Sequence, residues 1–176
     1  MHKTPTLGIV ASGSNSGKTT VITKLLPALA KHNIRVSVIK HAHHKFDIDH
    51  PGKDSYNIRE AGAVQTLIAS GKRWALMTEV ERTPDDSGEA DLTSLLAQLD
   101  HTYADLILVE GFKKTKIPKI EIHRPSLGLP LLAEDDPNII AVACDEAIDC
   151  TKPQLALNDT TAICTFIMHW IQAAHD

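Results

Sequence analysis

Short apolar runs alternate along the chain with segments in which apolar residues recur at helical spacing. The runs predict strands over residues 7–10, 35–40, 64–69, 74–78, 105–110, 119–122 and 138–143. The helical spacing predicts helices over residues 18–32, 54–61, 91–99 and 160–173. Strands separated by helices need crossover connections, which favour parallel pairing with helices on both faces. Residues 70–72 join two strands directly and predict a hairpin. The pattern therefore predicts a three-layer α/β fold with a mainly parallel, mixed β-sheet.

Composition narrows the class of protein. At 176 residues the chain can bury one core, so we expect a single domain over residues 1–176. The 18 basic and 22 acidic residues give a net charge of −4, which argues against nucleic acid or an anionic membrane as partner. No signal peptide or membrane-spanning run is found, which favours the cytoplasm. Cys144, Cys150 and Cys164 lack Cys-x-x-Cys spacing and indicate reduced thiols.

The strongest chemical signal is a loop of small residues between the first strand and the first helix. Its residues are Gly13, Ser14, Asn15, Ser16, Gly17, Lys18, Thr19 and Thr20. In a phosphate-binding loop, backbone N–H groups and a helix N-terminus surround an anionic oxygen. Lys18 would reach the β and γ phosphates, and the Thr19 hydroxyl would bind Mg²⁺. The strict pattern has glycine where Ser12 stands, and the alternative is an ordinary turn into a helix. The flanking strand and helix favour a P-loop NTPase fold.

Glu110 is the second candidate, because it ends a strand of four aliphatic residues. The carboxyl end of such a strand is where ligands bind in open α/β sheets. Glu110 would hold Mg²⁺ opposite Thr19, directly or through water. The alternative is a glutamate that faces solvent at the end of a strand.

The third candidate is the segment after the second strand, where Lys40 and His41 are expected to face the nucleotide. With His43, His44 and His50, this segment is rich in imidazoles. Structural zinc is one interpretation, but no second cluster of ligands accompanies these histidines. Contact with phosphate or a pterin-like ligand is the other.

Asp47 and Asp49 alternate around an apolar residue, so both carboxylates can point the same way. They would then face Mg²⁺ or the water that attacks the γ-phosphate. The alternative is a solvated acidic loop.

Together these segments resemble a known family, the molybdopterin-guanine dinucleotide biosynthesis adapter proteins, which are the B proteins of the Mob pair. The resemblance covers nearly the whole chain and is carried by residues 16–20, 39–44, 47–55, 59–63, 73–78 and 108–112. It implies a cytoplasmic, homodimeric P-loop protein that binds GTP with Mg²⁺ and hydrolyses it weakly. It also implies a partner, the molybdenum cofactor guanylyltransferase, which attaches GMP to molybdopterin to form the guanine dinucleotide.

Carried over by position, the resemblance gives each candidate a role. The loop from Gly13 to Thr20 would hold the phosphates, with Lys18 acting in catalysis. Thr19 and Glu110 would hold the metal, and Asp47 and Asp49 would contact the metal or the attacking water. We expect Asp49 among the metal ligands and Glu110 among the catalytic residues.

The sequence contains no Asn-Lys-x-Asp motif, the arrangement in which a carboxylate accepts the N1 and N2 protons of guanine. Asp145 is the available substitute, because it follows a core strand directly and would lie near the base. A plain turn-forming residue is the alternative at this position.

Three functions are consistent with these sequence features. The first is a GTP-binding adapter with weak GTPase activity. The second is an ATP- or GTP-dependent small-molecule kinase or ligase of the dethiobiotin synthetase kind. The third is a binding module that carries the finished cofactor and grips its pyrophosphate with the P-loop. The resemblance favours the adapter.

Overall fold

The computed structural model describes residues 4–42, 46–84 and 89–175. The chain divides into two compact units, which are described separately. The first, here called the sheet unit, comprises residues 1–41 and 92–176, and the second, the hairpin unit, comprises residues 42–91. The expectation of a single domain over residues 1–176 stays a prediction.

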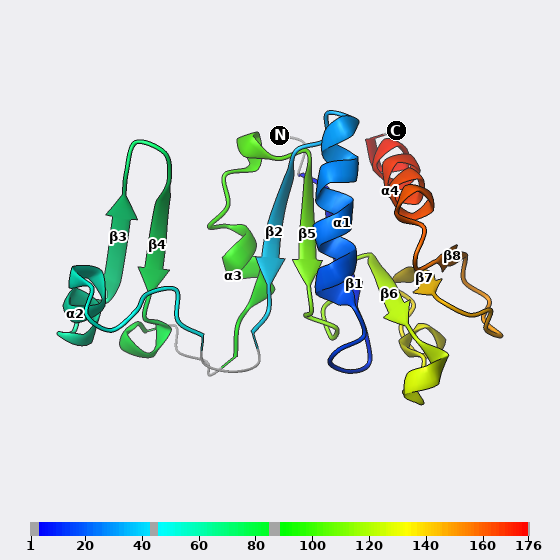
Figure 1. Ribbon diagram of the computed structural model, residues 1–176, viewed down its shortest axis with the longest axis horizontal. Helices are drawn as coiled ribbons and strands as arrows, with labels where there is room; N and C mark the ends of the chain where they lie inside the picture. Colours follow the sequence, from blue (N-terminus) through cyan, green and yellow to red (C-terminus); the bar gives the residue numbers. More distant parts are fainter. Residues whose placement is uncertain (1–3, 43–45, 85–88, 176) are drawn as a thin grey trace. The chain divides into compact units, whose positions relative to one another are not determined.

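The sheet unit is built on six strands in the order β2-β5-β1-β6-β7-β8 (Figure 1). The strands are β1 (Thr6–Val10), β2 (Val36–Lys40), β5 (Leu106–Glu110), β6 (Lys119–His123), β7 (Ile139–Cys144) and β8 (Gln154–Ala156). Every neighbouring pair is parallel. The carboxyl ends of the strands therefore lie along one edge, where ligands bind in open α/β sheets. The strand β8 was not predicted, because three residues are too short to show a period.

Helices cover both faces of this sheet, so the predicted three-layer P-loop fold is confirmed. Alternation along β5 divides its side chains between two cores, since Leu106 and Leu108 face one core and Ile107 and Val109 the other. The first core also contains residues of α1 (Lys18–Lys31) and α4 (Thr160–His175). The second contains Leu92 of α3 (Leu92–Leu96). The four short 3₁₀ helices of the described chain are η1 (Val80–Arg82), η2 (His101–Tyr103), η3 (Pro125–Leu127) and η4 (Leu132–Glu134).

The hairpin unit contains α2 (Asp54–Glu60) and the antiparallel strands β3 (Gln65–Ala69) and β4 (Trp74–Thr78). The predicted hairpin is thus confirmed. It forms a two-stranded sheet of its own, however, so the six-stranded sheet is parallel throughout rather than mixed. A hairpin needs only its own two strands to pair, and the sequence pattern does not show whether it joins a larger sheet.

Within the described ranges, no helix combines the length and apolar character needed to cross a membrane.

Candidate functional site

The phosphate loop connects the end of β1 to the first residue of α1, Lys18. Gly17 adopts a left-handed conformation with φ of +98°, which favours glycine, and turns the chain into the helix. The Ser16 hydroxyl and the Lys18 ammonium both donate to the Gly13 carbonyl, at 2.9 and 3.0 Å. The first turn of α1 carries no acidic residue, so no carboxylate competes for its N-terminus. The loop is therefore formed as a site for an anion.

Ser12, the one departure from the strict pattern, has a structural role. Its hydroxyl donates to the carbonyl of Pro130. Next to it, Gly13 packs against Leu129 so closely that a Cβ on Gly13 would lie 2.7 Å from the Leu129 Cδ1 atom. Residues 124–136, here called the covering segment, therefore lie against the first turn of the loop. Ser12 anchors this segment, and a glycine at that position would lack the hydroxyl to do so.

Glu110 lies beside Thr19 and is only 7% exposed, so it does not face solvent. The Thr19 hydroxyl donates to Glu110 Oε1 at 2.9 Å. The Lys40 ammonium donates to the same oxygen at 2.8 Å and lies 3.3 Å from the Thr19 hydroxyl oxygen. A cationic group thus already bonds to both oxygens that were predicted to bind Mg²⁺. Because a hydroxyl and a carboxylate are hard oxygen donors, this pair fits a magnesium ion.

Positive charge gathers around the loop. The pKa of Lys18 is lowered, chiefly by burial, while the charge of Glu110 opposes that shift and the charges of Lys40 and Lys113 reinforce it. Lys113 also donates to the carbonyl of Ser12 at 3.4 Å. Lys18 and Lys40 therefore share one buried carboxylate, and Lys113 adds a third positive charge near Lys18. A polyphosphate would relieve their mutual repulsion, which is the electrostatic condition expected of a phosphate site.

His41 extends the same edge of the sheet beyond β2. Its backbone N–H donates to the Glu110 carbonyl at 2.9 Å, and its ring stacks on Phe112 with the centroids 4.5 Å apart. Gly111 has φ of +90°, and a Cβ there would lie 2.9 Å from His41 Cβ. The glycine after Glu110 therefore lets β2 and β5 end side by side.

Asp47 and Asp49 belong to the hairpin unit, so their position relative to the phosphate loop stays a prediction. Asp47 is exposed and pairs with Arg59 at 2.9 Å. Asp49 is 8% exposed, and its Oδ1 accepts from the His50 backbone N–H at 3.0 Å. Its Oδ2 is buried and has no hydrogen-bond partner among the described residues. The two carboxylates therefore differ in their surroundings, and of the two only Asp49 has a buried oxygen to which no described residue donates.

The histidine interpretations remain partly open, because His43 and His44 lie outside the described residues. Among the residues that are described, no group of three or more His, Cys, Asp or Glu side chains is placed to hold a metal ion.

Asp145 follows β7 directly, as expected, and is linked to the phosphate loop by a residue that the sequence did not reveal. Arg124 donates from Nη1 to Asp145 Oδ2 at 2.5 Å and from Nε to the Ser16 carbonyl at 3.2 Å. Arg124 was missed because it lies far from both partners in sequence and belongs to no motif.

Comparison with known proteins identifies the family of this chain. The model of the family described as molybdopterin guanine dinucleotide synthesis protein B matches residues 6–145. The molybdopterin-guanine dinucleotide biosynthesis adapter protein of Escherichia coli (strain K12) is 47% identical over 163 residues, covering 92% of this chain and 91% of that protein. Its counterpart from Haemophilus influenzae is 42% identical over 174 residues, covering 99% of this chain and 93% of that protein.

Solved structures show that this fold is shared. A crystal structure of molybdopterin-guanine biosynthesis protein B has a TM-score of 0.71 and 29% identity, covering 95% of this chain and 99% of that one. The structure of the protein B of Bacillus subtilis has a TM-score of 0.70 at 24% identity, covering 93% and 96%. The resemblance stated from the sequence motifs is confirmed. This chain belongs to the family of molybdopterin guanine dinucleotide synthesis protein B.

Proposed function

We propose that this chain is a GTP-binding adapter with weak, Mg²⁺-dependent GTPase activity that assists the attachment of GMP to molybdopterin. The observation that carries the proposal is the contact of Thr19 and Lys40 with the buried Glu110 carboxylate beside the phosphate loop. These groups supply the oxygens for a metal and the cations for a polyphosphate at one edge of the sheet. The names of the similar proteins supply the pathway.

Thr19 and Glu110 would hold Mg²⁺, which neutralises charge on the triphosphate. Lys18 and Lys40 would then bind phosphate oxygens. Asp49, with its unpaired buried oxygen, is a further metal ligand or water-orienting group in this proposal, and Asp47 a second. The one arginine bonded to the described part of the loop, Arg124, is held by Asp145 and the Ser16 carbonyl, and no glutamine side chain bonds there. We therefore expect slow hydrolysis, with a rate on the order of 10⁻⁴ to 10⁻² s⁻¹.

The kinase or ligase alternative is not favoured, since the curated relatives are named as adapters of this pathway. An adapter needs a partner, and the nucleotidyltransferase that acts on molybdopterin is the one proposed here. Molybdopterin or its guanine dinucleotide would be the shared ligand.

A homodimer is also proposed. Leu67, Trp74 and Leu76 lie on one face of the hairpin at 60%, 64% and 41% exposure. A two-stranded hairpin is marginally stable by itself, and an apolar face of this kind favours association. Light scattering at micromolar concentration should give the mass of two chains, and a monomer mass would refute this part of the proposal.

Calorimetric titration with GTP, GDP and ATP, with and without Mg²⁺, tests the nucleotide site, with phosphate release measured in parallel. We expect Mg²⁺-dependent GTP binding with slow turnover and weaker ATP binding. Lys18→Ala should abolish binding, whereas Lys31→Ala, at the exposed end of the same helix, should not change it. Glu110→Gln should retain binding in EDTA and lose hydrolysis. ATP binding equal to GTP binding would favour the kinase or ligase instead.

A further inference from the structure

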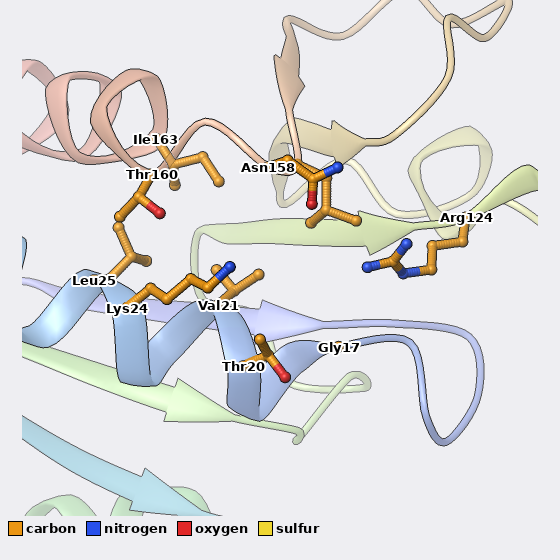
Figure 2. Close-up of a pocket in the computed structure, with 10 residues that line it drawn as sticks. Gly17, Thr20, Val21, Lys24, Leu25, Arg124, Asn158, Thr160 and Ile163 are labelled. Atoms are coloured by element: carbon orange, nitrogen blue, oxygen red, sulfur yellow. The ribbon is translucent and has the colours of Figure 1, made fainter.

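A small pocket lies beside the phosphate loop between α1 and the start of α4, on the β6–β8 side of β1, whereas Glu110 ends β5 on the other side of β1. Its polar lining comes from Thr20 and Lys24 on α1, Arg124 after β6, and Asn158 and Thr160 at the start of α4. Figure 2 shows the side chains of Lys24, on α1, and Arg124, after β6, pointing toward one another, with Asn158 near β8. Gly17, the last residue of the loop before α1, also lines it.

The order of the strands indicates that the nucleoside would lie near this pocket. Glu110, a proposed metal ligand, ends β5, and Lys40, a proposed phosphate ligand, ends β2, so the terminal phosphates belong there. A nucleotide bound along the loop must then extend toward β6, β7 and β8, because these strands lie on the other side of β1. The base and ribose would therefore reach the pocket and Asp145, which is bonded to the pocket residue Arg124.

Arg124 joins this region to the phosphate loop. Its guanidinium bonds to Asp145 Oδ2 and to the Ser16 carbonyl, at 2.5 and 3.2 Å. The Arg124 side chain is 33% exposed and that of Asp145 19%, so the pair is partly withdrawn from water. Two N–H groups of one planar side chain thus fix the carboxylate relative to the loop.

The second oxygen of this carboxylate is unused. Asp145 Oδ1 is buried and accepts no hydrogen bond within the described chain. A buried acceptor without a donor costs free energy, which a ligand that supplies a donor recovers. Guanine offers two adjacent donors, N1–H and N2–H, whereas adenine offers a single N6–H₂ donor beside an unprotonated N1 that a carboxylate would repel. The free oxygen therefore favours guanine.

We propose that Asp145 reads the guanine base through its free oxygen, and that Arg124 is a positioning residue that holds this carboxylate and couples it to Ser16 of the phosphate loop. This inference rests on the proposed GTP site. The pocket has a volume of about 20 Å³, room for a water rather than a base. The long side chain of Lys24 must therefore shift when the base enters, while Arg124 keeps its bonds to Asp145 and Ser16.

Asp145→Asn tests the base-reading role by exchanging an acceptor for a donor. The amide can donate to the O2 atom of xanthine, which the carboxylate repels. We expect GTP affinity to fall by about tenfold to a hundredfold and XTP affinity to rise, so that XTP binds better than GTP. Asp149→Asn, an exposed substitution in the same loop, is the matched control and should change neither affinity.

Tripolyphosphate with Mg²⁺ separates this inference from the proposed function, because it occupies the phosphate loop without a base. The Asp145→Asn variant should bind it as the unaltered protein does. If the variant still prefers GTP to XTP, or loses tripolyphosphate as well, Asp145 does not read the base. If the unaltered protein binds neither GTP nor tripolyphosphate, the proposed GTP site is itself wrong.

Arg124→Gln tests the positioning role through the ratio of GTP to ITP affinity, since inosine lacks the N2 donor. Loss of positioning should bring this ratio toward one, with partial rescue in Arg124→Lys. A purely structural role would weaken both nucleotides equally and leave the ratio unchanged, which would overturn this part of the inference.

Discussion

Replacing Lys119 with methionine should destabilise the protein strongly, although Lys119 belongs to no motif. The Lys119 side chain is 1% exposed, and its ammonium has three acceptors. These are Asp136 Oδ2 at 2.5 Å, the Thr115 carbonyl at 2.6 Å and the Lys113 carbonyl at 3.1 Å. All three ammonium N–H groups are thus used, and methionine would fill the space but leave these acceptors without a donor.

The expected cost follows from this geometry. Removing one partner of a buried ion pair costs about 3–5 kcal/mol, because the remaining charge is left uncompensated. Asp136 is 22% exposed and still accepts from the side chain and backbone of Asn138. We therefore expect a loss near the lower limit, about 3 kcal/mol. A domain with an ordinary stability of about 5–15 kcal/mol would remain folded, so the loss can be measured.

Urea unfolding followed by circular dichroism measures this loss, with Lys114→Met as the control because Lys114 is exposed in the loop that precedes β6. The control should change stability by less than about 0.5 kcal/mol. An equally small change in the Lys119 variant would refute the assignment of a buried, fully bonded ammonium.

Acid titration provides a second readout of the same pair. Burial acts to raise the pKa of Asp136, but hydrogen bonds from Lys119 and Asn138 and the charge of Lys119 outweigh it and lower the pKa. The stabilisation is therefore present above the unfolded-state pKa of about 3.9 and is lost as pH falls through the lower folded-state pKa. The difference between the unaltered protein and the Lys119 variant should shrink over that interval, and a constant difference would contradict this account.

Three further outcomes are expected. Gly13→Ala should cost about 1–2 kcal/mol in urea unfolding because its Cβ would crowd Leu129, and adding Leu129→Ala should recover part of it; no recovery would contradict that contact. Hydrogen bonds from Arg35 lower the pKa of Asp105 to about 2, so the small stability loss in Arg35→Gln should disappear as pH falls from about 3.9 toward 2. Thr19→Ala should make GTP affinity nearly independent of Mg²⁺ in calorimetry, and an unchanged dependence would remove Thr19 from the metal site.

The parts of the site that the sequence predicted are local in the chain. The phosphate loop lies between one strand and the next helix, and Glu110 closes an aliphatic strand, so periodicity and residue type were sufficient. Arg124 and Lys119 were not predicted, because their partners come from other segments and a basic residue is ordinarily placed on the surface. Glu121 was missed because an acidic residue is likewise ordinarily placed on the surface, and its partners also come from another segment. It is fully buried and accepts the backbone N–H groups at the start of η4.

The hairpin shows a related limit at the level of topology. The turn at residues 70–72 and the antiparallel pairing of the strands on either side of it were predicted correctly. The sequence could not show that these strands form their own sheet, because the same alternation suits a strand at the edge of a larger one. The prediction was therefore right about the element and wrong about the sheet to which it belongs.

These unpredicted contacts share one location, the covering segment of residues 124–136. Lys119 bonds to its last residue, Glu121 accepts from the middle, and Arg124 begins it with bonds to the phosphate loop and to the end of β7. Ser12 donates to it from the loop itself. Because the segment is fixed both to the core strand β6 and to the loop, a base that bonds to Asp145 would also act, through Arg124, on the Ser16 carbonyl. Base recognition and phosphate binding should therefore be energetically coupled, and the loss of GTP affinity in Asp145→Asn combined with a phosphate-loop variant should not be additive.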